Sequence, residues 1–249
     1  MAFEILNPHG KANIILISEH ASNHIPNDYK KLGLDDRLLE THIAWDIGIG
    51  SITRNLSAML DAPAVLARFS RLLIDANRGL DQSGLIPEAS DGHAIPGNQN
   101  LSTDQLNERV EKFYKPFHEA VDQLVKSNIK DTAAPIILNM HSFTPVMNNK
   151  QRKWQAGMLW NRDDRVAKVL GPSLTKRGFI VGDNEPYSGQ QLNHTMNTHG
   201  TQYGYPHLNI EIRQNEISNE QDINKWSDIL FEEINTIRNL PEMSYIKHY

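Results

Sequence analysis

The chain has 249 residues, of which 39% are hydrophobic and 22% are charged, a composition typical of a globular protein with one sizeable core. Its net charge of −5 argues against a general nucleic-acid or membrane-surface partner, because phosphate binding normally shows as a basic patch. The sequence contains no cysteine, so disulfides, thiolate metal sites and a cysteine nucleophile are excluded, and any metal must be held by His, Asp, Glu or Asn.

The first residues, Met1 to Pro8, contain no basic region, and no stretch of the chain approaches the roughly 18 apolar residues of a membrane helix. We therefore expect a cytoplasmic enzyme or binding protein that contacts neither membrane nor nucleic acid. No repeat or linker interrupts the sequence, which predicts a single domain over residues 1–249.

The first predicted strand is the apolar run from Asn13 to Ser18, which ends at Glu19 and His20. The small residues that follow let the chain turn sharply and leave the imidazole open to a ligand. Residues 27–40 are polar with scattered leucines, so we expect a loop with short helical turns there.

Apolar residues at helical spacing then predict an amphipathic helix over residues 41–60, with Asp46 in its first turn. The helix dipole alone favours an acidic residue at that position, while the functional interpretation is that Asp46 faces the His20 loop as a metal ligand. Residues 63–69 and 71–74 predict two strands or one long bent strand.

The polar cluster Asp75-Ala-Asn77-Arg78 follows that strand directly. The planar guanidinium of Arg78 suits a carboxylate held by two hydrogen bonds, and the structural alternative is an ion pair between Arg78 and Asp75. Residues 80–100 have the composition of a long excursion or lid. A capping box at Ser102 begins a long amphipathic helix, in which Pro116 predicts a kink or break.

The apolar run from Ile136 to Phe143 predicts a buried interior strand that ends near His141. Taken alone, a histidine at a strand end is more often hydrogen-bonded into a loop than bound to a metal. His20 and His141 together, however, are what a metal site assembled from neighbouring strand ends requires.

Further along, residues 156–160 and 179–181 predict strands, residues 163–176 a surface helix, and residues 190–200 helical turns that bring His199 towards a pocket. The last predicted helix is capped at Ser218.

The segment from His207 to Arg213 alternates so that Leu208, Ile210 and Ile212 share one face and the polar side chains share the other. On a central strand Glu211 would be a buried carboxylate, whose raised pKa would suit a general base. The alternative is a surface pair between Glu211 and Arg213 on an edge strand. The alternation of strands and helices predicts an α/β fold with a mixed, mostly parallel sheet and helices on both faces.

Suppose that the two histidines meet one carboxylate. Two imidazoles and a carboxylate leave one position open on a tetrahedral zinc ion, which is the arrangement of a catalytic site. Zinc lowers the pKa of a water molecule to about 7 and polarises an amide carbonyl, while a glutamate moves the proton. Hydrolysis of an amide next to a carboxylate follows from these parts if they converge.

Five motifs bring these residues together: Ser18-Glu-His-Ala-Ser-Asn-His-Ile-Pro26, Trp45-Asp-Ile-Gly48, Ser70-Arg-Leu-Leu-Ile-Asp-Ala-Asn-Arg78, Asn139-Met-His-Ser-Phe143 and Asn209-Ile-Glu-Ile-Arg213. In this order they resemble the N-formylglutamate amidohydrolase family, over a region from about Asn13 to Arg238. The resemblance implies a phosphorylase/hydrolase-like α/β fold and hydrolysis of N-formyl-L-glutamate to formate and L-glutamate.

Three of the motifs are also similar, more distantly, to elements of zinc carboxypeptidases. This resemblance implies that His20 and His141 are zinc ligands, that Asn77 and Arg78 bind a substrate carboxylate, and that Glu211 is the catalytic glutamate. The sequence departs from the carboxypeptidase pattern at the middle ligand, where Asn23 stands in place of a glutamate. We expect Asp46 as the third ligand, with Asn23 or Glu19 as the alternatives.

The remaining expected roles are an oxyanion contact or second carboxylate contact for Arg71, and pocket contacts for His199 and Arg213. The partner is a small molecule with a carboxylate, and the protein is expected to be a monomer or small homo-oligomer. An alternative enzyme is a carboxypeptidase-like or other N-acyl amino acid hydrolase. An alternative of another class is a carboxylate-binding protein without catalysis, which the absence of zinc and a separation of the proposed ligands would favour.

Overall fold

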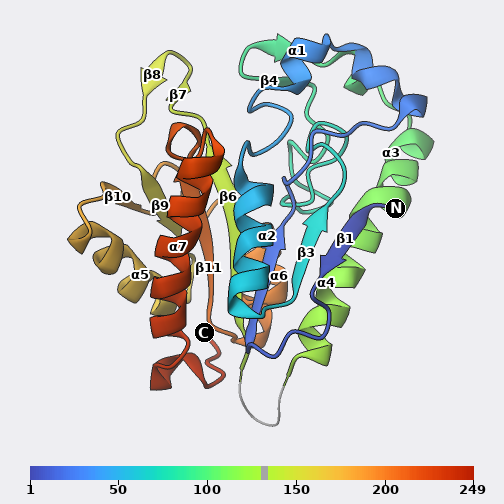
Figure 1. The fold of residues 1–249 in the computed structure, drawn as a ribbon. Coiled ribbons are helices and arrows are strands. Elements are labelled where there is room, and N and C mark those ends of the chain that lie inside the picture. Colours follow the sequence, from blue (N-terminus) through green and yellow to red (C-terminus); the bar gives the residue numbers. More distant parts are fainter. Residues whose placement is uncertain (130–133) are drawn as a thin grey trace.

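The computed structural model describes residues 1–129 and 134–249, which form a twisted sheet flanked by helices (Figure 1). The main sheet has seven strands in the order β1-β3-β2-β6-β11-β9-β10. Neighbouring strands are parallel from β3 to β11 and between β9 and β10, and antiparallel at β1–β3 and β11–β9. The bounds of these strands are β1 Phe3–Leu6, β2 Ile14–Ser18, β3 Ala64–Ala67, β6 Ile136–Phe143, β9 Ala156–Leu159, β10 Val181–Asp183 and β11 His207–Arg213. The predicted α/β fold with a mixed, mostly parallel sheet is confirmed.

Helices cover both faces of this sheet, as the sequence predicts (Figure 1). One face packs against α2 (Ile49–Leu60), α5 (Arg165–Lys176) and α7 (Glu220–Ile237). The other face packs against α4 (Lys115–Ser127) and α6 (His194–His199). Along β2, Ile14 and Leu16 belong to the first core and Ile15 and Ile17 to the second. Because both sides are covered, an interior strand can be apolar at every position.

The helix predicted over residues 41–60 begins later, at Ile49, so Asp46 precedes the helix instead of lying in its first turn. Gly48 interrupts the helical pattern because its φ is +83°, a conformation that glycine adopts without strain. A Cβ on Gly48 would also lie 2.7 Å from the carbonyl oxygen of Ile217. The Asp46 amide instead donates to the carbonyl of His20 at 3.0 Å, which fixes the turn against the end of β2.

The apolar residues Leu72, Leu73 and Ile74 are buried, but the predicted strand over residues 71–74 does not form. The Ser70 hydroxyl accepts a hydrogen bond from the Leu72 amide and donates to the Ala44 carbonyl, so the chain turns there and leaves the sheet. The side chains of Leu72, Leu73 and Ile74 enter the core from a loop. Burial without strand pairing therefore explains this run of apolar residues.

Several other boundaries refine the sequence-based expectations. The strand predicted at 179–181 is β10, which begins at Val181. The last helix is capped by Asn219, not Ser218, since the Asn219 side chain accepts from the Asp222 amide. The capping box at Ser102 is present and begins α3 (Thr103–Arg109), which continues into α4 through a π-helical segment, Val110–Tyr114. This wider turn comes directly before α4 and accommodates Pro116, which has no amide hydrogen to donate.

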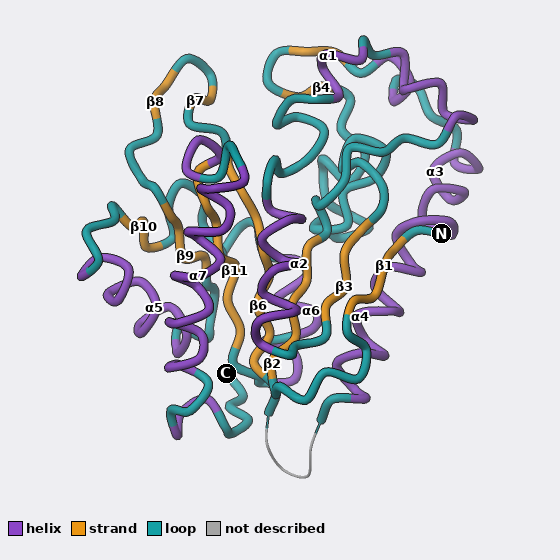
Figure 2. Tube along the Cα trace, viewed as in Figure 1, coloured by secondary structure: helices purple, strands orange, loops and turns teal. Residues whose placement is uncertain are grey.

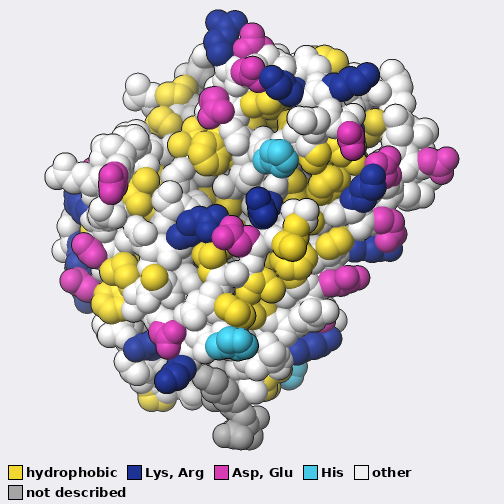
Figure 3. All heavy atoms as spheres, turned by 45° about the vertical axis from the view of Figure 1, so that its right-hand side comes forward, with side chains coloured by type: hydrophobic (Ala, Val, Ile, Leu, Met, Phe, Trp, Pro, Cys, Tyr) yellow, Lys and Arg dark blue, Asp and Glu magenta, His cyan; other side chains and the backbone are white. Residues whose placement is uncertain are grey.

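Long loops gather beyond the carboxyl ends of β2, β3 and β6, at the upper end of the molecule in Figure 2. They include α1 (Asp36–Leu39), the hairpin of β4 (Ala89–Ser90) and β5 (His93–Ala94), and the hairpin of β7 (Val146–Met147) and β8 (Lys150–Gln151). On the face drawn in Figure 3, acidic and basic side chains are interspersed. Among the described helices, none is long and apolar enough to cross a membrane.

Candidate metal and catalytic site

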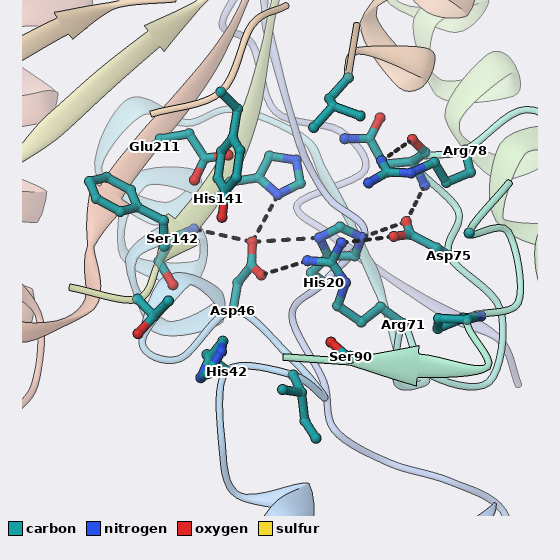
Figure 4. A pocket seen from close by; sticks show the side chains of 18 of the residues that line it. His20, His42, Asp46, Arg71, Asp75, Arg78, Ser90, His141, Ser142 and Glu211 are labelled. Carbon is teal, nitrogen blue, oxygen red and sulfur yellow. Dashed lines mark hydrogen bonds and ion pairs between the residues drawn. The ribbon is translucent and has the colours of Figure 1, made fainter. Parts of the chain in front are cut away.

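His20, Asp46 and His141 come together at the carboxyl ends of two neighbouring parallel strands (Figure 4). His20 lies just after β2, and His141 lies on β6 near its end. Their ring centroids are 4.9 Å apart. Asp46 reaches both rings from the turn before α2, and one potential ligand atom of each residue lies within 4.8 Å of the other two. All three side chains are buried.

The two Nδ1 atoms face the same carboxylate oxygen. His141 Nδ1 lies 2.8 Å and His20 Nδ1 3.5 Å from Asp46 Oδ2. His20 Nδ1 is buried without a hydrogen-bond partner among the described residues. A buried polar atom without a partner costs free energy unless something else binds it. Two imidazoles and one carboxylate, with a buried nitrogen still to be satisfied, fit a zinc ion with an open coordination position.

The opposite nitrogen of each imidazole faces a second carboxylate. His20 Nε2 lies 2.8 Å from Asp75 Oδ1, and His141 Nε2 lies 3.4 Å from Glu19 Oε2. Carboxylates in this position fix the orientation and tautomer of histidines that bind metals. Glu19 therefore lies behind His141 and outside the group of three, and Asn23 donates to the carbonyl of Leu39. Of the three residues considered for the third ligand, Asp46 alone faces both histidines.

The electrostatics of this cluster are dominated by burial and by close charge pairs. Burial alone would raise the pKa values of Asp46 and Asp75, but the neighbouring cationic groups hold both well below the usual range. Burial opposes the protonation of His141, yet Glu19 and Asp46 outweigh it and raise the pKa of His141 to about 9. This cluster of negative charge is suited to a cation.

Glu211 lies beside the cluster on β11, where it pairs in register with His141 on β6. β11 is an interior strand between β6 and β9, so the alternative of an edge strand is wrong. Burial raises the pKa of Glu211 to about 7, and its Oε2 is buried without a hydrogen-bond partner among the described residues. A carboxylate in this state is able to exchange a proton near neutral pH.

The two arginines of the loop after β3, Arg71 and Arg78, differ in their contacts. Arg71 donates to Asp75 at 2.8 Å and lies 3.5 Å from Asp46, so its charge is shared between two carboxylates. Arg78 donates to the carbonyl of Asn77 and has no acidic partner among the described residues. The predicted alternative, an ion pair between Arg78 and Asp75, does not form, because Arg71 pairs with Asp75 instead. Arg78 keeps hydrogen-bond donors for a ligand.

A cavity of about 430 Å³ contains the three grouped residues together with Glu211, Arg71 and Arg78. The excursion predicted over residues 80–100 forms part of its wall through Ser83, Gly84, Pro87 and Ser90. Figure 4 shows Arg78 on one side of the His20–Asp46–His141 group and Ser142 on the other. Arg78 and the His20–Asp46–His141 group thus line the same cavity.

Comparison with known proteins identifies the family of this chain. The sequence model of the N-formylglutamate amidohydrolase family matches residues 12–218. The chain belongs to this family. It is therefore an amidohydrolase, and the family supports hydrolysis of the amide bond of N-formylglutamate.

Two solved structures are similar to this chain. Gene product Atu2144 from Agrobacterium tumefaciens is 32% identical, with 95% of this chain and 94% of that chain covered and a TM-score of 0.90. The N-formylglutamate amidohydrolase from Ralstonia eutropha JMP134 is 20% identical, with 95% of this chain and 98% of that chain covered and a TM-score of 0.68, a likeness that shows the shared fold. No curated protein sequence matches the chain.

Two residues that the sequence suggested for substrate binding do not line the cavity of this family member. The His199 ring stacks on His118, with its Nε2 3.0 Å from His118 Nδ1. Arg213 pairs with Glu216 and donates to the carbonyls of Arg152 and Lys153. Both side chains are thus engaged in contacts within the protein.

The sequence analysis missed the residues that hold the Asn77–Arg78 loop from behind. Tyr114 donates through its hydroxyl to the carbonyl of Arg78 at 2.8 Å, and His118 Nε2 lies 2.9 Å from the carbonyl of Ala76. Burial lowers the pKa of His118 to about 3, so this ring is neutral and donates from Nε2. Tyr114 and His118 are spaced four residues apart on a helix, which in the sequence resembles an ordinary core pattern.

We expect Tyr114→Phe to raise the KM for a carboxylate substrate by about 2- to 12-fold with little change in kcat, because the hydrogen bond to the Arg78 carbonyl is lost. The variant also loses the contact of this hydroxyl with His194 Nε2 at 2.7 Å. Steady-state kinetics would measure both constants. Tyr29→Phe is the matched control, since the Tyr29 hydroxyl donates to Glu108 on the surface. A fall in kcat at unchanged KM would contradict a positioning role for Tyr114.

Proposed function

We propose that this protein is a zinc-dependent amidohydrolase that converts N-formyl-L-glutamate and water into formate and L-glutamate, with residues 1–249 acting as one amidohydrolase domain. The observation that carries the proposal is a single cavity in which His20, Asp46 and His141 meet beside Glu211 while Arg78 keeps its donors free. Membership of the family supports the reaction, and the unsatisfied nitrogen of His20 supports the metal.

In this proposal His20, Asp46 and His141 hold the zinc ion, with Asp75 and Glu19 orienting the two imidazoles. When bound, zinc lowers the pKa of a water molecule and polarises the amide carbonyl. Arg78 binds the substrate carboxylate, and Asn77 lines the cavity beside it. The Asn77 amide oxygen accepts from the Thr195 backbone, which leaves its NH2 group to face the substrate.

Glu211 acts as the base and then as the acid. It takes one proton from the attacking water, whose oxygen forms a bond to the formyl carbon, and it delivers that proton to the amide nitrogen as the C–N bond breaks. The formic acid that forms contains the water oxygen and gives its remaining proton to the free amino group, so formate and the ammonium form of L-glutamate leave. Arg71 contributes positive charge near the developing oxyanion, although Asp46 and Asp75 share that charge.

The proposal predicts formate release from N-formyl-L-glutamate by purified protein that carries about one equivalent of zinc. Formate would be quantified enzymatically, with N-acetyl- and N-butyryl-L-glutamate as comparison substrates, and metal content by elemental analysis. A preference for the larger acyl groups would favour the alternative of another N-acyl amino acid hydrolase. Absence of any hydrolysis by protein with stoichiometric metal would reject the proposal.

A further inference from the structure

Six arginines of the described chain are buried or half-buried, and two of them have no partner that satisfies the guanidinium. Three pair with carboxylates: Arg71, Arg165 and Arg213. Arg109 donates to the oxygens of Leu73, Gly97 and Asn98. Arg78 and Arg152 remain: Arg78 lines the cavity, and Arg152 lies against Tyr187 and Phe143, which line it.

The backbone of Arg152 is fixed at the base of the β7–β8 hairpin. Its amide donates to the carbonyl of Pro145 at 2.9 Å, and its own carbonyl accepts from Arg213 Nη1 at 2.9 Å. Arg213 extends from the end of β11, two residues after Glu211. The strand that carries Glu211 thus also holds the backbone of Arg152 in place.

The side chain of Arg152 lies against two aromatic residues that line the cavity. Its guanidinium carbon is 4.6 Å from the centre of the Tyr187 ring and 5.8 Å from that of Phe143. Nη1 donates to the Tyr187 hydroxyl at 2.8 Å and more weakly to the Thr144 carbonyl at 3.4 Å. Nε and Nη2 make no hydrogen bond to the described residues, so donors remain for a ligand.

The Tyr187 hydroxyl accepts from Arg152, which leaves its own proton to donate. Burial, followed by the nearby Glu211 carboxyl, raises the pKa of Tyr187, so the phenol keeps that proton at neutral pH. A guanidinium and a hydroxyl donor at one position can bind the two oxygens of a carboxylate. Tyr187 is half-buried and lines the cavity, so its hydroxyl is accessible to a ligand there.

We propose that Arg152 and Tyr187 form a second carboxylate subsite, so that the substrate carries one carboxylate for Arg78 and another for Arg152. This inference rests on the proposed function, because it concerns the same cavity. Phe143 follows Ser142, which Figure 4 shows across the His20–Asp46–His141 group from Arg78. The second carboxylate belongs either to the side chain of the amino acid or to the acyl group, and substrate choice separates these two sources.

The test compares pairs of substrates that differ only in a carboxylate and its neutral amide. One pair is N-formyl-L-glutamate and N-formyl-L-glutamine; the other is the N-succinyl and N-succinamoyl derivatives of L-glutamine. For each pair the ratio of the two kcat/KM values measures the preference for the second carboxylate. Arg152→Met keeps the long side chain that packs on Tyr187 and Phe143 but removes the charge, and Arg152→Lys restores a cation.

We expect Arg152→Met to lower this ratio by roughly 10- to 100-fold for one of the two pairs, because that is the usual loss when a hydrogen bond to a charged group is removed. Arg152→Lys is expected to recover part of the ratio. Arg162→Met is the matched control, since Arg162 is exposed and, unlike Arg152, donates to neither Tyr187 nor Thr144 among the described residues. The pair that responds identifies the source of the carboxylate. An unchanged ratio for both pairs in Arg152→Met, with active wild-type enzyme, would overturn the subsite. Wild-type protein that hydrolyses none of the four compounds would instead overturn the proposed function.

Discussion

Glu211→Gln is expected to lower kcat for N-formyl-L-glutamate by about 10²- to 10⁴-fold while the protein keeps its metal, because an amide of the same shape cannot take or return the proton. Glu211 is buried on an interior strand and is not one of the three grouped residues. The variant therefore separates proton transfer from metal binding.

The measurement combines stopped-time assays of formate release with elemental analysis of the same preparation. Glu233→Gln is the matched control, since Glu233 on α7 is also buried but pairs with Arg177 and Ser173 of the α5 region and does not line the cavity. Glu211→Gln with near wild-type turnover would remove Glu211 from the mechanism. Loss of metal in the same variant would place it among the ligands instead.

The parts of the site that the sequence predicts are those carried by strands. The runs before His20 and His141 are apolar on both faces, and the alternation around Glu211 assigns one face to the core. Once these strands are placed side by side in a parallel sheet, their carboxyl ends must meet. The predicted start of the helix at residue 41 is wrong, because α2 begins at Ile49. Asp46 nevertheless lies at the expected edge of the sheet, because the turn before Gly48 brings it there.

The parts that the sequence does not predict depend on pairing between distant segments. Nothing local to Asp75 says that it binds His20 and Arg71, since Arg78 is nearer to Asp75 in sequence than Arg71 is. Arg152 and Tyr187 are 35 residues apart in the chain, and a basic residue in a polar connection is normally a solvated side chain. Its contact with Tyr187 follows from the packing of the β7–β8 hairpin, which composition and periodicity do not encode.

Removal of the metal is expected to lower thermal stability as well as activity. A ligand that binds the folded state at 100 to 1,000 times its dissociation constant contributes about 3 to 4 kcal/mol, which for a chain of this size corresponds to roughly 5 to 16 °C in Tm. Protein treated with a chelator should therefore melt lower, and added zinc should restore both Tm and formate release. Stability provides a readout that does not depend on turnover.

His141→Ala identifies the residues responsible for this effect. The substitution removes a buried imidazole ring and leaves a cavity in its place. The Tm of the variant is therefore expected to be lower than that of the wild type with or without metal. The informative quantity is the rise in Tm on adding zinc, which should disappear in His141→Ala and persist in His24→Ala, whose exposed side chain is outside the group of three. Equal zinc-dependent rises in the two variants would show that the metal binds elsewhere, and the proposed roles of His20 and Asp46 would fall with that of His141.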